Sequence, residues 1–426
     1  TTAPIAAIIS PLFLGILADR FLPSQIVMGV LHLLGGALLL VAPSMLAEGT
    51  SPWLFIGVLL AHMLCYMPTL GLSNTIAFKA MTQPDKQFPL VRVWGTIGWI
   101  VAGLLIALIA RYLHPVQDYL AGGLTLGAYE AAKAAIADGA AVEQGVLALV
   151  AQTDAAVALA RNGDPQFFYV AGASGILLGV VSFGLPHTPA PLKGKPVNVG
   201  AMLGLDTLKL MRDRSFAVFI IGSMLICIPL AAYYQQAAEF ARQAGVEDVP
   251  FKMSFGQMSE IVFMLLMPLF FARLGVKWML TVGMLAWVVR YGLFAGAWGG
   301  PGGEHVMWMI LLGIILHGIC YDFFFVTGQI YTEQRAPHEI RAQAQSFLVL
   351  VTQGIGMLIG AQLVGKLINH YSEETPDGTV VHWDSVWLAP TVFAGVVMVG
   401  FFLLFKKQPV QPSPDDIGDE PMEGVL

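Results

Sequence analysis

The sequence predicts an all-α membrane protein built from two similar halves of membrane-spanning helices. Three observations favour this fold class. The 426 residues are 56% hydrophobic and only 12% charged, whereas about 25% of the residues of a soluble domain are charged. Eleven apolar stretches have roughly the length of about 20 residues that a helix needs to cross a bilayer. A pattern near the start of the chain also recurs in its second half.

The spans follow one another with short polar breaks between them. AEGTSP, GGPGGEH and QRAPHEIRAQ are such breaks, and they supply Gly, Pro and charge where helices are expected to end. In order, the predicted spans are 3–18, 25–46, 52–76, 89–110, 167–186, 215–238, 254–272, 277–297, 305–330, 343–365 and 385–405.

Charge on the loops predicts the orientation of the chain. If the loops alternate between the two sides of a bilayer, one side carries 15 of the 22 Lys and Arg residues. Positive loops favour the cytoplasm, so we expect a multi-pass protein of the bacterial inner (plasma) membrane with a cytoplasmic C-terminus. The residues on the positive side are Arg20, Lys79, Lys86, Arg92, Lys193, Lys195, Lys209, Arg212, Arg214, Arg273, Lys277, Arg335, Arg341, Lys406 and Lys407.

An internal echo indicates two halves. PLFLGILADRFLPSQIVMG, from Pro11, resembles PLFFARLGVKWMLTVG, from Pro268: each is an apolar helix, a cationic turn and another apolar helix. Transporters are often built from such repeats around a site near the membrane midplane.

The repeat also predicts how the chain is divided. Compared with the second half, the first half has one helix fewer, and we expect that helix upstream of Thr1. The expected divisions are an N-terminal transmembrane half at 1–186 with an outer, Ala-rich helical insertion at about 113–166, a cytoplasmic linker at 187–214, a C-terminal transmembrane half at 215–405 and a cytoplasmic tail at 406–426.

Ionisable residues within the spans are the candidates for function. Asp322, Glu260 and Arg290 lie inside apolar stretches, and Arg92 lies at or just inside the cytoplasmic end of one. Such groups are costly in a membrane and usually face a protein interior or a water-filled path. The alternative for each is an ion pair that only locks helices together.

Helical spacing groups further side chains with these ionisable residues. Gln257 and Glu260 are three residues apart and share a helix face, which suits hydroxyl groups. A hydrogen bond that packs two helices is the alternative. In VRVWGTIGW, Arg92, Thr96 and Trp99 fall at i, i+4 and i+7 on one face, although Trp99 would also suit packing.

The stretch HGICYDFFFVTGQIY places Asp322 among aromatic residues. Asp322 shares a face with Phe325 and Gln329, and Tyr321 lies beside it. Aromatic rings stack on a flat solute and carboxylates accept hydrogen bonds from its hydroxyls. A carboxyl group shielded from water can also hold a proton and release it as access alternates. Weaker candidates are Tyr234, which interfacial anchoring would also explain, and His317 and His62, which packing would explain.

Several classes of chemistry find no support in the sequence. Cys65, Cys227 and Cys320 all fall in apolar runs without metal-type spacing, which indicates neither disulfides nor a metal site. The sequence contains no Walker loop, no GxGxxG after a strand, no HExxH and no GxSxG. We therefore predict a protein that is not an enzyme, uses no cofactor, binds no nucleic acid, and draws on an ion gradient if its transport is uphill.

Several strings in order resemble one known family. YMPTLGLSNTIAF, FPLVRVWGTIGWI, SMLICIPL, QMSEIVFMLLMPLFFARLGVK and HGICYDFFFVTGQIY, followed by EIRAQAQ, are similar to the nucleoside:proton symporters of the major facilitator superfamily. The resemblance covers nearly all of the chain apart from the outer insertion and the tail. It implies the major facilitator fold of two six-helix halves, a central nucleoside site and inward co-transport of a proton.

The resemblance also implies roles for particular residues. By similarity, amide and carboxylate side chains meet the ribose, while cationic and aromatic positions serve the base. The matching positions are Arg92, Thr96, Trp99, Gln257, Glu260, Tyr321 and Asp322, with Tyr234 and Phe325 as further substrate-binding candidates, and Asp322 and Glu260 as proton-coupling candidates that the sequence does not rank.

The sequence departs from the family after SMLICIPL. The family tends to present amides there, whereas this chain has Ala231, Ala232, Tyr233 and Tyr234. Two alternatives therefore stay open beside a monomeric nucleoside:proton symporter. One is a symporter of another polyol or sugar-like solute, and the other is a membrane receptor that binds a nucleoside without transporting it.

Overall fold

The described part of the chain is helical except for one short hairpin. The computed structural model describes residues 2–16, 21–46, 50–163, 165–190, 205–246, 249–300, 303–337, 340–375 and 378–406. The elements in chain order are α1 (Thr2–Ile16), α2 (Ser24–Val41), η2 (Ala42–Leu46), α3 (Pro52–Lys79), α4 (Pro84–Leu113), η3 (Val116–Tyr119), α5 (Leu126–Ala137), α6 (Gln144–Gly163), α7 (Gln166–Ser182), α9 (Leu205–Leu208), η4 (Lys209–Arg212), α10 (Arg214–Gln243), α11 (Val249–Ala297), α12 (Met307–Ile315), α13 (His317–Tyr321), η5 (Asp322–Val326), α14 (Thr327–Arg335), α15 (Arg341–Val349), η7 (Leu350–Gly356), α16 (Met357–His370), β1 (Ser372–Thr375), β2 (Gly378–Val381) and α17 (Trp383–Leu404).

The predicted all-α membrane fold is confirmed. Within the described ranges, eight helices are long and apolar enough to cross a membrane, and Gln166–Ser182 is a shorter apolar helix. The longest, α11, contains two predicted spans, which meet at a kink where Gly275 has a φ of 68°. Only glycine adopts such a backbone conformation readily, so the kink coincides with the glycine between the two predicted spans.

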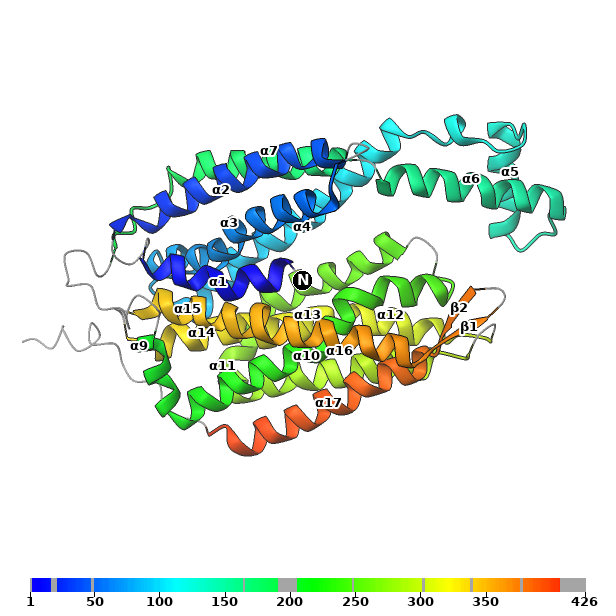
Figure 1. Cartoon of the computed structure of the whole chain (residues 1–426). Helices are drawn as coiled ribbons and strands as arrows, with labels where there is room; N and C mark the ends of the chain where they lie inside the picture. The colour runs from blue at the N-terminus through cyan, green and yellow to red at the C-terminus, as the bar shows by residue number, and fades with distance from the viewer. Residues whose placement is uncertain are drawn as a thin grey trace, which may run out of the picture.

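The helices form two bundles that lie side by side (Figure 1). In the first bundle, α2 packs against α3 and α7, and α1 packs against α3. In the second, α10 packs against α16 and α17, and α11 packs against α12, α13 and α17. Contacts between the bundles join α4 to α11, α3 to α15, and α1 to α15 and η7.

An apolar cluster fastens the two bundles together. Phe78 of α3 and Phe88 of α4 stack with ring centroids 4.2 Å apart. They belong to a buried cluster with Met264 and Met279 of α11 and Phe323 of η5. In Figure 1 the ribbons of the bundles diverge toward the end that carries α5, α6, β1 and β2 and converge at the opposite end. Phe78 lies in the last turn of α3 and Phe88 near the start of α4, where the chain passes from one helix to the next at the converging end. The cluster therefore closes one end of the junction between the bundles.

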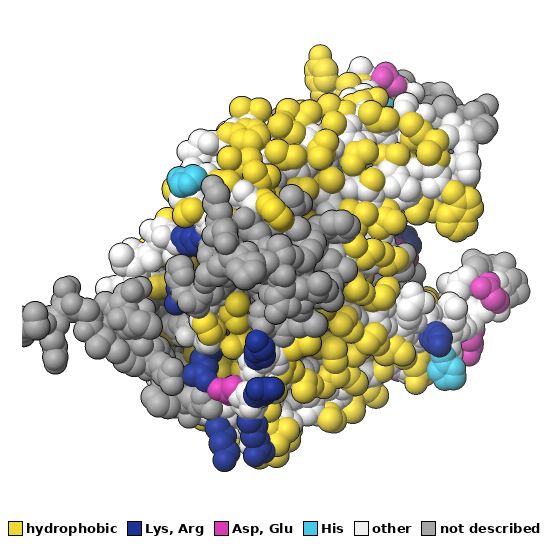
Figure 2. Space-filling view, turned by 60° about the vertical axis from the view of Figure 1, so that its left-hand side comes forward, with side chains coloured by type: hydrophobic (Ala, Val, Ile, Leu, Met, Phe, Trp, Pro, Cys, Tyr) yellow, Lys and Arg dark blue, Asp and Glu magenta, His cyan; other side chains and the backbone are white. Residues whose placement is uncertain are grey.

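The converging end of the molecule is rich in basic side chains, and we call it the basic end. Lys79, Arg212, Arg335 and Arg341 belong to it, at the ends of α3, η4 and α14 and the start of α15. Figure 2 turns this end toward the reader and shows Lys and Arg side chains gathered there beside broad hydrophobic surfaces. Such exposed apolar flanks, with Trp94 at 71% exposure for example, suit a lipid environment.

Asp213 connects two helices at the basic end. Its carboxylate caps α10 by accepting hydrogen bonds from the backbone N–H groups of Ser215 and Phe216, and it pairs with the guanidinium of Arg335. Burial raises the pKa of the Asp213 carboxyl, but the backbone N–H groups and Arg335 together lower that pKa further, to below its ordinary value of 3.8. The ionised carboxylate therefore stabilises the fold at pH values above the ordinary pKa of 3.8. This contribution to stability is lost as the pH falls through the lowered pKa of the folded state.

Replacement of Asp213 is expected to weaken this end measurably. Asp213→Ala removes the cap and the ion pair and should lower the free energy of unfolding by about 1 kcal/mol or more. Asp213→Asn keeps a capping oxygen and should lose less. Thermal unfolding of the purified protein at neutral pH checks both variants, and equal loss in the two would contradict a capping role.

The remaining segments lie at the periphery. The expected outer insertion contains η3, α5 and α6, and α5 contacts α6 through Lys133, whose Nζ lies 2.9 Å from Oδ2 of Asp154. Residues 191–204 of the expected linker, and all but the first residue of the expected tail at 406–426, lie outside the described residues. The antiparallel hairpin, in which Ser372 pairs with Val381, is not among the predicted elements.

Candidate functional site

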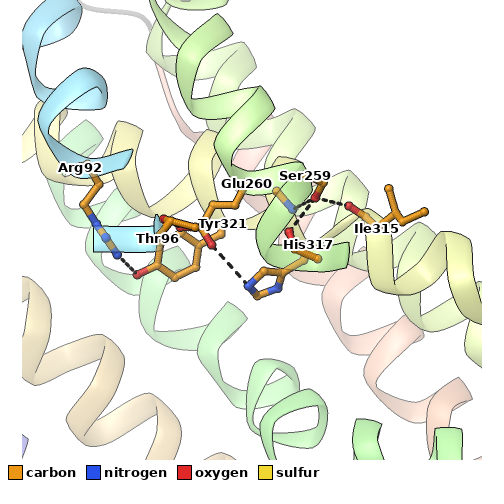
Figure 3. Close-up of polar contacts among 9 residues, drawn as sticks. Arg92, Thr96, Ser259, Glu260, Ile315, His317 and Tyr321 are labelled. Carbon is orange, nitrogen blue, oxygen red and sulfur yellow. Dashed lines mark hydrogen bonds and ion pairs between the residues drawn. The ribbon is translucent and has the colours of Figure 1, made fainter. Parts of the chain in front are cut away.

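The junction between the bundles brings several predicted site residues together. Arg92 of α4 donates a hydrogen bond from Nη2 to the hydroxyl of Tyr321 of α13 at 3.0 Å. The same guanidinium lies 5.6 Å from the centre of the Tyr321 ring. Figure 3 shows this contact reaching from one bundle to the other. Residues separated by 229 positions in the sequence thus form one contact.

A second contact crosses the junction one helical turn along α4. The hydroxyl of Thr96 donates a hydrogen bond to Oε1 of Glu260 of α11 at 2.5 Å. The other carboxylate oxygen of Glu260 lies 3.8 Å from Nε2 of His317. Thr96 and Glu260 are buried, with 3% and 5% of their surfaces exposed. The spacing of Arg92 and Thr96 on one face of α4, predicted from the sequence, is what allows both contacts.

Asp322 is the most deeply buried acid of the site. Its exposure is 0%, and neither carboxyl oxygen has a hydrogen-bond partner among the described residues. It lies within electrostatic range of Glu260 and Arg92. Asp322 opens η5, a π-helical turn between α13 and α14. Single π-turns within α-helices are frequent at functional sites.

The other predicted residues border this cluster to different extents. Phe325 is buried, and its ring lies 5.1 Å from the ring of Tyr321. Tyr234 of α10 is 53% exposed and lies within electrostatic range of Tyr321 and Glu260. Gln257 is half-buried on the helix that carries Glu260. Trp99 is 71% exposed and follows Arg92 and Thr96 along α4.

His317 lies next to the cluster. Packing was the expected role, and the imidazole does stack on Tyr233, with ring centroids 5.6 Å apart and planes 20° apart. The same imidazole also lies beside Glu260. The sequence does show that His317 precedes Tyr321 by four residues and so shares its helix face. Ser259 also belongs to this region, as Figure 3 shows.

The composition of the cluster limits its chemistry. Two carboxyl groups, a guanidinium and several aromatic rings can bind hydroxyl groups, a flat ring and a proton. No group of three His, Cys, Asp or Glu side chains that could hold a metal ion occurs among the residues that were described. Two bundles of membrane-spanning helices with a buried polar cluster between them are typical of membrane transport proteins.

Comparison with known proteins identifies the family within this class. The family model described as Nucleoside H+ symporter matches residues 1–120 and 145–409. The chain therefore belongs to the nucleoside:H+ symporter family and is a transporter of the major facilitator superfamily rather than an enzyme. The unmatched residues 121–144 fall in the expected outer insertion.

Individual relatives and solved structures agree with this assignment. YegT of Escherichia coli (strain K12) is 34% identical over 406 residues, which are 95% of this chain and 84% of YegT. The crystal structure of the nucleoside transporter NupG superposes with a TM-score of 0.59 at 27% identity, over 96% of this chain and 89% of that one. FucP, a major facilitator superfamily transporter solved in the outward conformation, gives 0.61 at 14% identity over 96% and 89%, and shows the fold alone.

Proposed function

We propose that this protein takes up nucleosides across the bacterial inner membrane together with protons, by alternating access of the two bundles. The observation that carries the proposal is the acid and arginine cluster at the junction, in which Asp322 is fully buried without a hydrogen-bond partner among the described residues. Ionisable groups in such positions are costly and are kept for a function. Membership of the nucleoside:H+ symporter family supports the cargo and the ion.

We assign the nucleoside to the polar side of the cluster. Glu260 and Gln257 lie on one helix, and their carboxylate and amide groups suit the ribose hydroxyls. Arg92 and the aromatic ring of Tyr321, which already contact each other, suit the flat, polar base. Trp99, Phe325 and Tyr234 extend the aromatic surface around them. A nucleoside bound in this way would contact residues of both bundles. Its binding would therefore be coupled to the relative position of the bundles.

We assign the proton to Asp322 rather than Glu260. Glu260 already receives a hydrogen bond from Thr96 and lies near His317, so the protein provides for its charged form. Asp322 has no such partners in the described structure, and burial of an ionised carboxylate without partners costs several kcal/mol. Asp322 is therefore best accommodated with a proton while it is buried, and it can release this proton when water reaches it.

The position of the apolar cluster supports a direction for this state. If the basic end faces the cytoplasm, as the charge on the loops predicts, the cluster of Phe78, Phe88 and their neighbours closes the cytoplasmic side of the junction. The diverging ends then face outward. Uptake requires this cluster to separate as the bundles rock, while contacts at the other end form.

Competition of uptake tests the cargo. Proteoliposomes that contain the full-length gene product are expected to accumulate labelled uridine or adenosine, and unlabelled nucleosides should compete where fucose and xylose do not. Competition by the sugars but not by nucleosides would instead indicate a symporter of polyols or sugar-like solutes. Nucleoside-dependent thermal stabilisation without any flux would indicate a receptor instead.

A further inference from the structure

The helix that carries the site is interrupted just before the site begins. α12 ends at Ile315, Leu316 forms a turn, and α13 begins at His317. α13 carries His317 and Tyr321, and Asp322 follows it directly. Interrupted helices are common at transporter binding sites, but within a membrane the backbone groups freed at a break need other partners.

Ser259 of α11 provides partners on both sides of the break. Its Oγ lies 2.6 Å from the carbonyl oxygen of Ile315, to which it can donate, and it accepts a hydrogen bond from the backbone N–H of Gly318 at 3.0 Å. Figure 3 shows Ser259 between the two helix segments. Gly318 permits this approach, because a Cβ atom there would lie 2.5 Å from the carbonyl carbon of Ser259.

Arg290, from the second half of α11, provides another partner. Its Nε donates a hydrogen bond to the carbonyl oxygen of Gly313 at 2.9 Å, at the C-terminal end of α12, where the helix dipole favours a positive charge. Arg290 is 0% exposed, and Nη1 and Nη2 of its guanidinium have no hydrogen-bond partner among the described residues. Its guanidinium lies 3.9 Å from the centre of the Tyr233 ring.

Each of the two side chains is also linked to a residue of the site. The ring of Tyr233 stacks on His317, with centroids 5.6 Å apart, so Arg290 supports the imidazole through Tyr233. Ser259 precedes Glu260 in α11, so the same turn of helix holds the break and presents the carboxylate. Ser259 and Arg290 of α11 thus hold the break, and Tyr233 of α10 links Arg290 to the imidazole.

We propose that Ser259 and Arg290 are positioning residues, which hold the break at Leu316 so that His317, Tyr321 and Asp322 face the junction. The inference rests on the proposed transport function for its consequence, but the break itself can be probed without transport. Loss of either side chain leaves backbone groups of the break without partners. Each such loss costs about 1–3 kcal/mol, which local opening of the helix would relieve.

Native cysteines report on this opening. Cys320 lies in α13, one turn past the break, and Cys227 lies in α10; both are buried, at 1% and 0% exposure. In the full-length protein with Cys65→Ser, Ser259→Ala is expected to speed maleimide labelling of Cys320 by about tenfold, with Cys227 unchanged. Ser259→Thr keeps the hydroxyl and should label as the parent does. Arg290→Met should speed labelling of Cys320 more than Arg290→Lys, which keeps the charge.

The outcomes separate positioning from general stability. Faster labelling of Cys320 alone, together with a maximal uptake rate that falls in Ser259→Ala and recovers in Ser259→Thr, supports the proposal. Equal acceleration at Cys227 and Cys320 would mean that the variants loosen the whole bundle, and it would overturn the proposal. Unchanged labelling in both Ser259→Ala and Arg290→Met would overturn it as well. Because labelling needs no substrate, a failure of nucleoside uptake leaves this test readable.

Discussion

Replacement of Asp322 by Asn is expected to abolish proton-driven accumulation of nucleoside. Asn has nearly the shape of a protonated Asp, so the fully buried position can accept it, but it cannot release or take up a proton. Exchange of labelled for unlabelled nucleoside across the membrane should persist, because exchange requires rocking of the loaded carrier and no net movement of protons. Comparison of accumulation and exchange in proteoliposomes measures the difference.

The matched control for this variant is Asp138→Asn, which removes an equal charge from an exposed position at the end of α5. It should accumulate nucleoside as the parent protein does. Normal accumulation by Asp322→Asn under a proton gradient would remove Asp322 from the coupling mechanism.

Replacement of Glu260 by Gln is expected to weaken nucleoside binding severely. Gln can still accept the hydrogen bond from Thr96, so the local contact between the bundles is kept. The charged acceptor for ribose hydroxyls is lost, however. Hydrogen bonds to charged groups contribute about 1.5–3 kcal/mol, so affinity should fall by roughly ten- to a hundredfold.

Binding of nucleoside to the purified Glu260→Gln protein, followed by calorimetry or thermal shift, checks this loss. Glu143→Gln, at an exposed position before α6, is the control and should bind as the parent does. Unchanged affinity in Glu260→Gln would place the sugar elsewhere. Loss of coupling with affinity retained would instead exchange the roles that we propose for Glu260 and Asp322.

Apolar length and breaker residues predicted most of the fold. The boundary between the spans at 254–272 and 277–297 falls at the Gly275 kink, because a positive φ favours glycine and the sequence places one there. The hairpin at Ser372–Val381 was missed because its strands are four residues each and carry too little alternation to stand out. Side-chain periodicity alone cannot place such short elements.

The candidate site was predicted residue by residue but not as a network. Periodicity correctly put Arg92 and Thr96 on one face, yet only the fold shows that their partners are Tyr321 and Glu260. The π-turn at Asp322 and the break at Leu316 could not be predicted from the sequence. Both lie where the chain packs against α11, and neither Asp322 nor Leu316 is a Pro or Gly. The approach of His317 to Glu260 is likewise visible only in the fold, since the two residues lie 57 positions apart in the sequence.

The central claim is that nucleoside and proton cross this protein together through Asp322. The most direct test is a pH-sensitive dye trapped inside proteoliposomes of the full-length protein, with uridine added outside and no imposed gradient. We predict acidification of the lumen that begins with uridine, is absent without it, and is lost in Asp322→Asn. Entry of labelled uridine with no acidification in the parent protein, or with equal acidification in Asp322→Asn, would contradict the account.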